Sequence, residues 1–330
     1  MGALFLSSVN PAHSTETDQF LTWDVELQDS AEHLNRHLNE ELHTFVARMN
    51  ERKRPVRTRE EMASEFFSFI FRNLLSPRIR RWLSTSPEID RFPDMSVSYF
   101  QYQDMSIYRR HSFPYLLPMA RTIRIGEIYL GIDKICHFFG FGRRYFLKYQ
   151  QLRDNGEGHE EAMERVIRIG ISQEQSVVGK LVDGIFSSGD LEANFQGLLL
   201  GLDLASEETP FFERVDGDWK ILRAIDIVLY VTPGFDETYN PSHYWALRKE
   251  YVLPIVKSEY CETFYSPTVL ARFARYGQYE PSLSARLVEE YFDSRRRNPR
   301  SLQSLEALCE ACCGESTQEV ANERYEKAAP

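Results

Sequence analysis

Apolar side chains recur every three or four residues along most of this chain, and this spacing predicts helices. In the clearest case, five of them line one side of a helix that begins after Ser30, namely Leu34, Leu38, Leu42, Phe45 and Met49. The same spacing predicts further helices over about residues 60–75, 126–150, 159–186, 191–202, 266–276 and 282–298. We therefore expect a mainly α fold class, a single helical globular domain over residues 15–314 with a minor β element. The polar residues 315–330 are expected to form a mobile tail.

The chain has 330 residues, of which 42% are hydrophobic, so it is long enough to bury a substantial core. Its 39 Lys and Arg residues against 49 Asp and Glu residues give a net charge of −10. Non-specific binding of nucleic acid needs a basic surface, so this balance argues against a nucleic-acid partner. The sequence contains no run of roughly 18–20 apolar residues, so we expect no transmembrane segment.

The first residues and the cysteines bear on the compartment. Residues 2–9 are apolar or small, and Ala12-His13-Ser14 matches a small-x-small cleavage site, so residues 1–14 are expected to be the remnant of a signal peptide. An ordinary flexible terminus is the alternative. The expected location is then the periplasm or the outside of the cell. Five cysteines are present, three of them in a C-x-x-C-C cluster: Cys309, Cys312, Cys313, Cys261 and Cys136.

A closed zinc site normally needs a second pair of ligands at similar spacing, and the sequence offers none that is obvious. A disulfide within the C-x-x-C-C cluster, or from it to Cys261, suits an exported chain at least as well. Free thiols are the third alternative. A nucleophilic Cys136 is disfavoured, because Cys136 and His137 are neighbours on a helix and point about 100° apart.

The first candidate site motif is Asp133-Lys134-Ile135-Cys136-His137-Phe138. Asp133 and His137 are four residues apart, so a helix places both on one face, with Tyr145 two turns further along. The carboxylate could orient the imidazole and raise its basicity, or both could bind a metal ion. The alternative is a surface pair worth a few tenths of a kcal/mol.

Two further motifs follow on the next two predicted helices. Glu174 lies between Gly170 and Gly179, and a glycine inside a helix costs roughly 1 kcal/mol, which suggests close packing against another backbone. We expect a glutamate between such glycines to point into a cleft. The segment from Ser188 to Gly197 then places Asp190 and Asn194 on a third helix, with Ser188 expected to cap its N-terminus.

The three motifs are D-K-x-x-H-F, a glycine-flanked Glu and S-x-D-L-x-A-N-x-x-G, in this order along the chain. Over about residues 126–202 they resemble the motifs of VanZ-like proteins and YfiM-type envelope lipoproteins. The resemblance implies a helical, envelope-associated unit that draws five residues together: Asp133, His137, Glu174, Asp190 and Asn194. VanZ-like proteins are embedded in the membrane, whereas these helices carry charged residues such as Arg143 and Lys148. Glu174-x-Ser176 at a helix end also resembles lysozyme-like glycosidases, which implies that Glu174 is a general acid, although the G-L-M-Q piece of that family is absent.

The leading hypothesis is a hydrolase of cell-envelope glycan, most concretely a lysozyme-like glycoside hydrolase that cleaves peptidoglycan without a cofactor. Glu174 would have a raised pKa and protonate the leaving oxygen, with Asp190 or Asp133 as the second carboxylate. His137 and Asn194 would orient the carboxylates or the substrate, and the remaining substrate-binding candidates are Ser188 and Tyr145. The negative net charge would favour a partly deacetylated, amine-bearing glycan.

Two alternatives remain open. Asp133, His137, Glu174 and Asp190 form a mixed nitrogen and oxygen ligand set for zinc or another divalent ion, which would make the chain a metal-dependent hydrolase. In the second alternative the chain is a non-enzymatic periplasmic binding or scaffold protein, and these residues form a buried hydrogen-bonded network. The exposure of Glu174 separates the two classes, because a catalytic Glu174 must face a cleft.

Two further sets of residues each allow two interpretations. Asp236 and Glu237 could add an acidic group to the same cleft, or form Asx-type turns before Pro241. Residues 95–108 alternate enough to predict a short strand or hairpin, and four aromatic residues there could stack on sugars or form one face of a half-buried strand. These residues are Tyr99, Phe100, Tyr102 and Tyr108.

Overall fold

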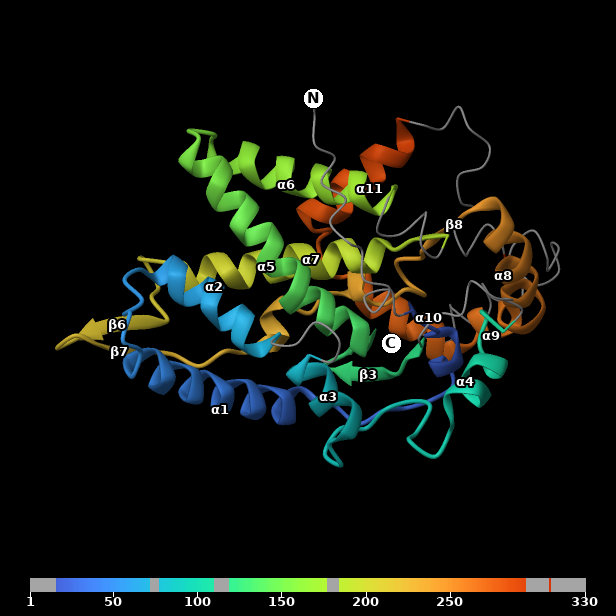
Figure 1. Ribbon diagram of the computed structural model, residues 1–330. Helices are drawn as coiled ribbons and strands as arrows, with labels where there is room; N and C mark the ends of the chain where they lie inside the picture. The colour runs from blue at the N-terminus through green and yellow to red at the C-terminus, as the bar shows by residue number, and fades with distance from the viewer. Residues whose placement is uncertain (1–15, 72–76, 110–118, 177–183, 295–308, 310–330) are drawn as a thin grey trace, which may run out of the picture.

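The structure is a computed structural model that describes residues 16–71, 77–109, 119–176, 184–294 and 309 (Figure 1). Residues 1–14, Gly179, Cys312, Cys313 and 315–330 therefore lie outside the described residues, and the predictions made for them stay predictions. The described part is mainly helical, which confirms the expected fold class. Its α-helices are α1 (Ala31–Asn50), α2 (Arg59–Ile70), α3 (Arg78–Thr85), α4 (Tyr99–Met105), α5 (Ile132–Asp154), α6 (His159–Glu174), α7 (Ser188–Ala205), α8 (Ala246–Glu259), α9 (Cys261–Phe264), α10 (Pro267–Tyr276) and α11 (Leu283–Asp293).

Short two-stranded sheets join the helices. The strands are β1 (Glu16–Thr17) parallel to β2 (Met119–Ala120), and three antiparallel pairs: β3 (Thr122–Ile125) with β4 (Ile128–Gly131), β5 (Ile185–Phe186) with β8 (His243–Tyr244), and β6 (Phe212–Val215) with β7 (Asp218–Ile221). Single 3-10 turns complete the fold at η2 (Phe20–Thr22), η3 (Ile227–Tyr230) and η4 (Pro233–Phe235). The β6–β7 hairpin turns at Asp216 and Gly217, which both have positive φ angles.

α1 forms as its apolar spacing predicts. It follows Ser30, and its apolar face is buried in the main core at the five predicted positions: Leu34, Leu38, Leu42, Phe45 and Met49. α10 begins directly after Ser266, whose side chain accepts a hydrogen bond from Val269 N at 3.4 Å. Figure 1 shows α1 along one long side of the molecule, with α2 beside it.

α5 and α7 cross near the middle of the molecule, and a pair of glycines allows their backbones to touch (Figure 1). A Cβ atom at Gly197 would overlap the carbonyl oxygen of Phe138 and lie 2.8 Å from the Cα of Gly142. The predicted backbone contact therefore exists, but at Gly142 and Gly197. At Gly170, where it was expected, the neighbour is the side chain of Tyr145.

Several predicted boundaries were wrong for identifiable reasons. The helix expected from residue 126 begins only at Ile132, because residues 128–131 pair with residues 122–125 as a hairpin. The helix expected over residues 159–186 ends at Glu174. The strand expected within residues 95–108 is the helix α4, which starts in a capping box between Ser98 and Gln101. α8 was missed because it contains Pro254, a residue that normally interrupts a helix.

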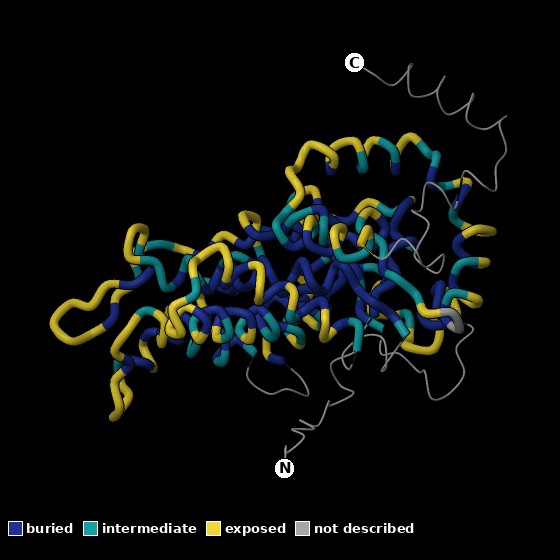
Figure 2. Tube along the Cα trace, turned by 90° about the horizontal axis from the view of Figure 1, so that it is seen from above, coloured by how far each residue is buried: buried dark blue, intermediate teal, exposed yellow. Residues whose placement is uncertain are grey.

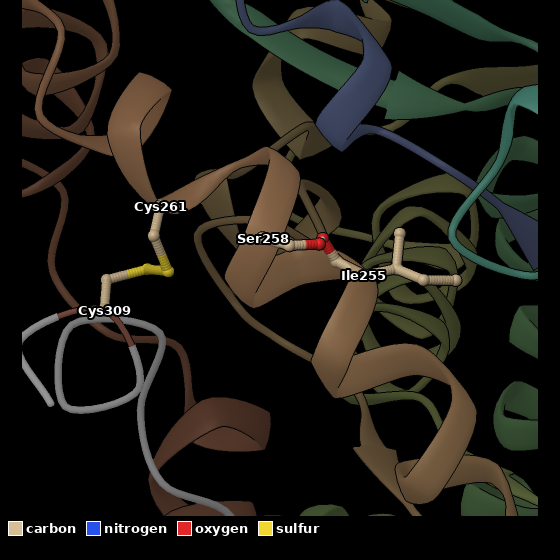
Figure 3. Close-up of a disulfide and its surroundings, with 4 residues drawn as sticks. All are labelled: Ile255, Ser258, Cys261 and Cys309. Carbon is tan, nitrogen blue, oxygen red and sulfur yellow. A yellow bond between two sulfur atoms is a disulfide. The ribbon is translucent and has the colours of Figure 1, made fainter. Parts of the chain in front are cut away.

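A disulfide joins Cys261, at the start of α9, to Cys309 in the C-terminal segment, with the Cα atoms 5.1 Å apart (Figure 3). Of the open alternatives for the cysteines, the structure therefore forms the bond from the C-x-x-C-C cluster to Cys261. Cys136 is a free thiol, and burial raises its pKa to about 12. It would be protonated at neutral pH, which agrees with the expectation that it is not a nucleophile.

Two groups of buried apolar side chains fill the interior. The larger group lies around α1, α2, α5, α6 and α7, and the smaller one surrounds Trp23 and includes α8, α9 and Cys261. None of the helices in the described ranges is both long and apolar enough to cross a bilayer. The candidate site lies where α5 and α7 meet, and its residues are buried. Figure 2 shows that buried residues fill the middle of the molecule, with exposed residues around them.

Candidate functional site

Local structure places the site residues at the starts of two helices. β4 leads directly into α5, so Asp133 and Lys134 lie in the first turn of α5 and His137 one turn later. α7 begins after Ser187, whose hydroxyl accepts a hydrogen bond from the backbone N–H of Asp190 at 3.0 Å. The N-cap is therefore Ser187, one residue before the expected Ser188.

Four charged side chains meet here in what we call the Lys134 cluster, consisting of Lys134, Asp133, Asp190 and Glu237. The ammonium of Lys134 is completely buried and donates to Asp133 Oδ2 at 2.8 Å, Asp190 Oδ1 at 2.7 Å and Glu237 Oε1 at 2.6 Å. Each carboxylate comes from a different part of the chain, so one cation joins α5, α7 and the loop after η4.

Hydroxyl groups complete the coordination of these carboxylates. Thr17 of β1 donates to Asp133 Oδ1 at 2.5 Å, and Ser187 donates to Glu237 Oε1 at 2.9 Å. A buried carboxylate needs such partners, because its hydration is lost on folding. The cluster therefore also fastens the N-terminal strand to the two central helices.

His137 contacts α7. Its Nδ1 lies 3.2 Å from Asn194 Oδ1, and its Nε2 lies 3.3 Å from Asp190 Oδ2. The carboxylate that orients the imidazole is thus Asp190, and the expectation that Asp133 does so was wrong. The reason is that Asp133 already accepts hydrogen bonds from Thr17 and Lys134.

Glu174 ends α6 and lies at the start of α7. Its Oε1 accepts a hydrogen bond from the backbone N–H of Ser187 at 3.2 Å, and the residue is only 5% exposed. Ser188 and Tyr145 are also buried, and Tyr145 packs its hydroxyl against Gly170. The structure thus gathers every candidate site residue at the junction of α5, α6 and α7, and all of them are buried.

As the structure places them, Asp133, Asp190 and Glu237 surround the ammonium of Lys134. Within the described ranges, no group of three or more His, Cys, Asp or Glu side chains is arranged to hold one. The position among Asp133, Asp190 and Glu237 where a cation would lie is taken by the Lys134 ammonium. A metal would therefore have to displace a buried lysine that is bonded to all three carboxylates.

The cluster holds one ammonium among three carboxyl groups, and this environment shifts the pKa values of Glu237 and Asp190. Burial raises the pKa of Glu237 to about 7, because the loss of hydration outweighs the attraction of Lys134, and Asp133 and Asp190 raise it further. Burial alone would also raise the pKa of Asp190, but His137 and Lys134 outweigh it and hold that pKa below its ordinary value. Glu237 therefore gains and loses its proton near neutral pH.

This pKa predicts that the protein loses stability as the pH rises. Folding raises the Glu237 pKa from 4.5 to about 7, so its contribution is complete below pH 4.5 and is lost as the pH passes through 7. Glu237→Gln keeps a neutral group at this position. The hydroxyls of Ser187 and Ser242 lie within hydrogen-bond distance of Glu237 Oε1 and can accept from the new amide. We expect the variant to gain about 2 kcal/mol relative to wild type between about pH 5 and about pH 8 in urea unfolding.

The difference between the two proteins at each pH reports mainly on Glu237. Buried Asp18 also has a pKa raised to about 7 and titrates in both proteins, and the charge of Glu237 is only the smallest of the causes that shift it. Glu213→Gln, an exposed position on β6, is the matched control and should show a difference that does not change with pH. If the difference in unfolding free energy between Glu237→Gln and wild type did not change with pH, Glu237 would not be a group that titrates near pH 7.

Sequence patterns missed one member of the cluster and left another as an open alternative. Lys134 is part of the D-K-x-x-H-F motif, but no role was predicted for it, and a lysine is seldom fully buried. Glu237 was weighed as an extra acidic group or part of a turn, and the structure uses both interpretations. Asp236 forms the turn by accepting from Thr238 N at 2.9 Å, while Glu237 reaches Lys134.

The four aromatic residues considered for sugar stacking divide into two pairs. Tyr102 and Tyr108 are buried, and the Tyr102 hydroxyl donates to Ala120 O at 2.9 Å. Phe100 is 70% exposed and Tyr99 is 37% exposed, with their ring centroids 5.3 Å apart. Of these four residues, Tyr99 and Phe100 are the two whose rings a ligand could contact.

Comparisons of the chain with protein-family models, curated proteins and solved structures found no match. The resemblance to VanZ-like and YfiM-type proteins, and that to lysozyme-like glycosidases, therefore stay predictions from the motifs.

Proposed function

We propose that this protein is a non-enzymatic, envelope-associated protein that binds envelope glycan, and that the Lys134 cluster is a structural network. The observation that carries the proposal is the burial of Glu174 and Asp190, which are 5% and 7% exposed. A general acid has to reach the glycosidic oxygen of a polysaccharide, which requires an open groove beside the carboxyl group.

The bonding of the two carboxylates supports the same conclusion. Glu174 accepts from the backbone at the start of α7, and Asp190 lies between the Lys134 ammonium and His137. These partners use the carboxylate oxygens that a reaction would need. Buried charges bonded in this way usually hold elements of a fold together in one arrangement.

Location in the envelope is supported by the disulfide between Cys261 and Cys309. Structural disulfides persist in oxidising compartments and are rare in the cytosol. The small-residue N-terminus and the resemblance to envelope proteins agree with this location.

Tyr99 and Phe100 are the proposed contact with glycan. Both are on α4, and exposed Met95 and Met105 lie close in the sequence. Exposed apolar side chains that gather at one place often mark a binding surface, and aromatic rings can pack on the apolar faces of sugar rings.

Hydrolysis of the same glycan is the second candidate, because one observation favours it. The His137–Asp190 pair adjoins Glu237, whose pKa is about 7, and shifted pKa values cluster at catalytic sites. In that case Glu174 would be the general acid and Asp190 the second carboxylate.

Sedimentation with purified peptidoglycan, native and chemically deacetylated, tests both candidates in one experiment. We expect wild type to sediment with the glycan and to release no soluble muropeptides, with or without a chelator. Phe100→Ser should weaken binding about tenfold, since it removes one aromatic contact worth about 1.4 kcal/mol. Binding should be tighter to deacetylated glycan, because its amines are cationic and the protein is acidic.

Leu229→Ser is the control, because Leu229 is equally exposed but lies on η3 and should bind like wild type. Muropeptide release that disappears in Glu174→Gln and survives chelation would replace the binding proposal with the glycosidase. Release that is lost on chelation would instead favour a metal-dependent hydrolase. Failure of folded wild type to sediment would refute glycan binding.

A further inference from the structure

A separate cavity of about 270 Å³ lies between α2 and α5, on the side of α5 that faces Phe67. Its walls are mostly aromatic and are formed by Phe67, Phe71, Phe139 and Phe141, with Gly140 and Ser68 between them. The ring of Phe141 is also stacked on His137, with centroids 4.9 Å apart, and His137 in turn contacts Asp190 of the Lys134 cluster.

Two adjacent arginines, Arg143 and Arg144, line the same cavity. Arg143 donates to the backbone oxygen of Ser64 at 3.0 Å and to its hydroxyl at 3.1 Å, and both of these acceptors are neutral. The guanidinium of Arg144 lies 4.5 Å from the centroid of the Phe141 ring. In the described part of the chain, neither guanidinium lies within ion-pair distance of a carboxylate.

By contrast, arginines elsewhere in the chain, such as Arg36, Arg78 and Arg223, each pair with a carboxylate. Partial burial and the charge of Arg143 together lower the pKa of Arg144. An anion at the mouth of the cavity would offset both effects and would form a charge-assisted hydrogen bond.

We propose that this cavity binds a small aromatic carboxylate, with its ring system among the phenylalanines and its carboxylate at Arg144. The volume is at the lower end of the range for ligand sites, which suits one or two fused rings. Ring stacking and the nearby guanidinium supply the apolar and polar halves of the recognition. The site is distinct from the α4 surface, so its test does not depend on glycan binding.

The probe is 2-naphthoate, with its binding to the full chain measured by calorimetry and compared with uncharged 2-naphthamide. We expect naphthoate to bind with one site, and both naphthamide and the Arg144→Gln variant to reduce the affinity about tenfold, the effect of losing one charge-assisted contact. Ser68→Phe should abolish binding, because its ring would fill the cavity. Arg214→Gln, on the β6–β7 hairpin, should bind like wild type.

Circular dichroism checks that each variant is folded, and Arg144 is exposed enough for glutamine to be tolerated. Equal affinity for naphthoate and naphthamide would refute the role of the guanidinium. Binding that survives Ser68→Phe would place the ligand elsewhere, and a folded wild type that fails to bind at millimolar naphthoate would refute the site.

Discussion

Replacement of Lys134 by methionine is expected to lower the free energy of unfolding by about 3–5 kcal/mol at neutral pH. Methionine keeps the length of the side chain but removes the cation that three buried carboxyl groups share. These groups must then either repel one another or take up protons at an energetic cost. Because protonation relieves the repulsion, the loss should become smaller as the pH falls.

Urea unfolding at several pH values measures this effect, and two further variants make it specific. Lys148→Met alters another lysine of α5, whose ammonium donates to Gln151 Oε1 at 2.9 Å, and should change stability little. Adding Glu237→Gln to Lys134→Met should recover part of the loss, since it removes one of the uncompensated charges. Strictly additive effects of these two changes would show that the lysine does not neutralise Glu237.

Replacement of Gly197 by alanine is expected to lower the free energy of unfolding by about 3 kcal/mol, the upper part of the usual range for overpacking. The added methyl would overlap the Phe138 carbonyl and lie 2.8 Å from Gly142 Cα, and both of these atoms belong to the backbone. A side chain could rotate away, but a backbone can yield only if α5 and α7 move apart. The contacts of His137 with Asn194 and Asp190 would then lengthen.

Gly158→Ala is the matched control for this change. Gly158 precedes α6 with a φ of −62°, and a Cβ atom there would meet nothing within 4 Å. Alanine is a poorer N-cap than glycine but leaves the unfolded chain less freedom, and these two small effects oppose each other. Thermal and urea unfolding should therefore place this variant within about 1 kcal/mol of wild type. If Gly197→Ala were as stable as Gly158→Ala, the close crossing of the two helices would be wrong.

The two effects have a common origin, because both depend on how closely α5 approaches α7. The contact between Gly142 and Gly197 brings the two backbones together. About one turn earlier on both helices His137 meets Asn194, and one turn before that Lys134 meets Asp190. The charged network and the helix contact therefore support each other. This explains why so polar a cluster can be buried without a cleft.

Local patterns were sufficient wherever near neighbours in the sequence decide the structure. The spacing of apolar residues predicted α1 and its buried face, because a helix repeats every 3.6 residues whatever lies elsewhere in the chain. For the same reason Asp190 and Asn194 could be placed on one helix, and both contact His137. The mainly α fold class follows from many such segments.

Only the tertiary structure decided the features that depend on distant residues. Lys134 is buried because Asp190 and Glu237, 56 and 103 residues away, surround it. The burial of Glu174 and the choice of Cys309 as the partner of Cys261 belong to the same class. A charge is buried at low cost only when hydrogen-bonding and oppositely charged partners surround it. Here those partners are far away in the sequence, so a local pattern does not reveal them.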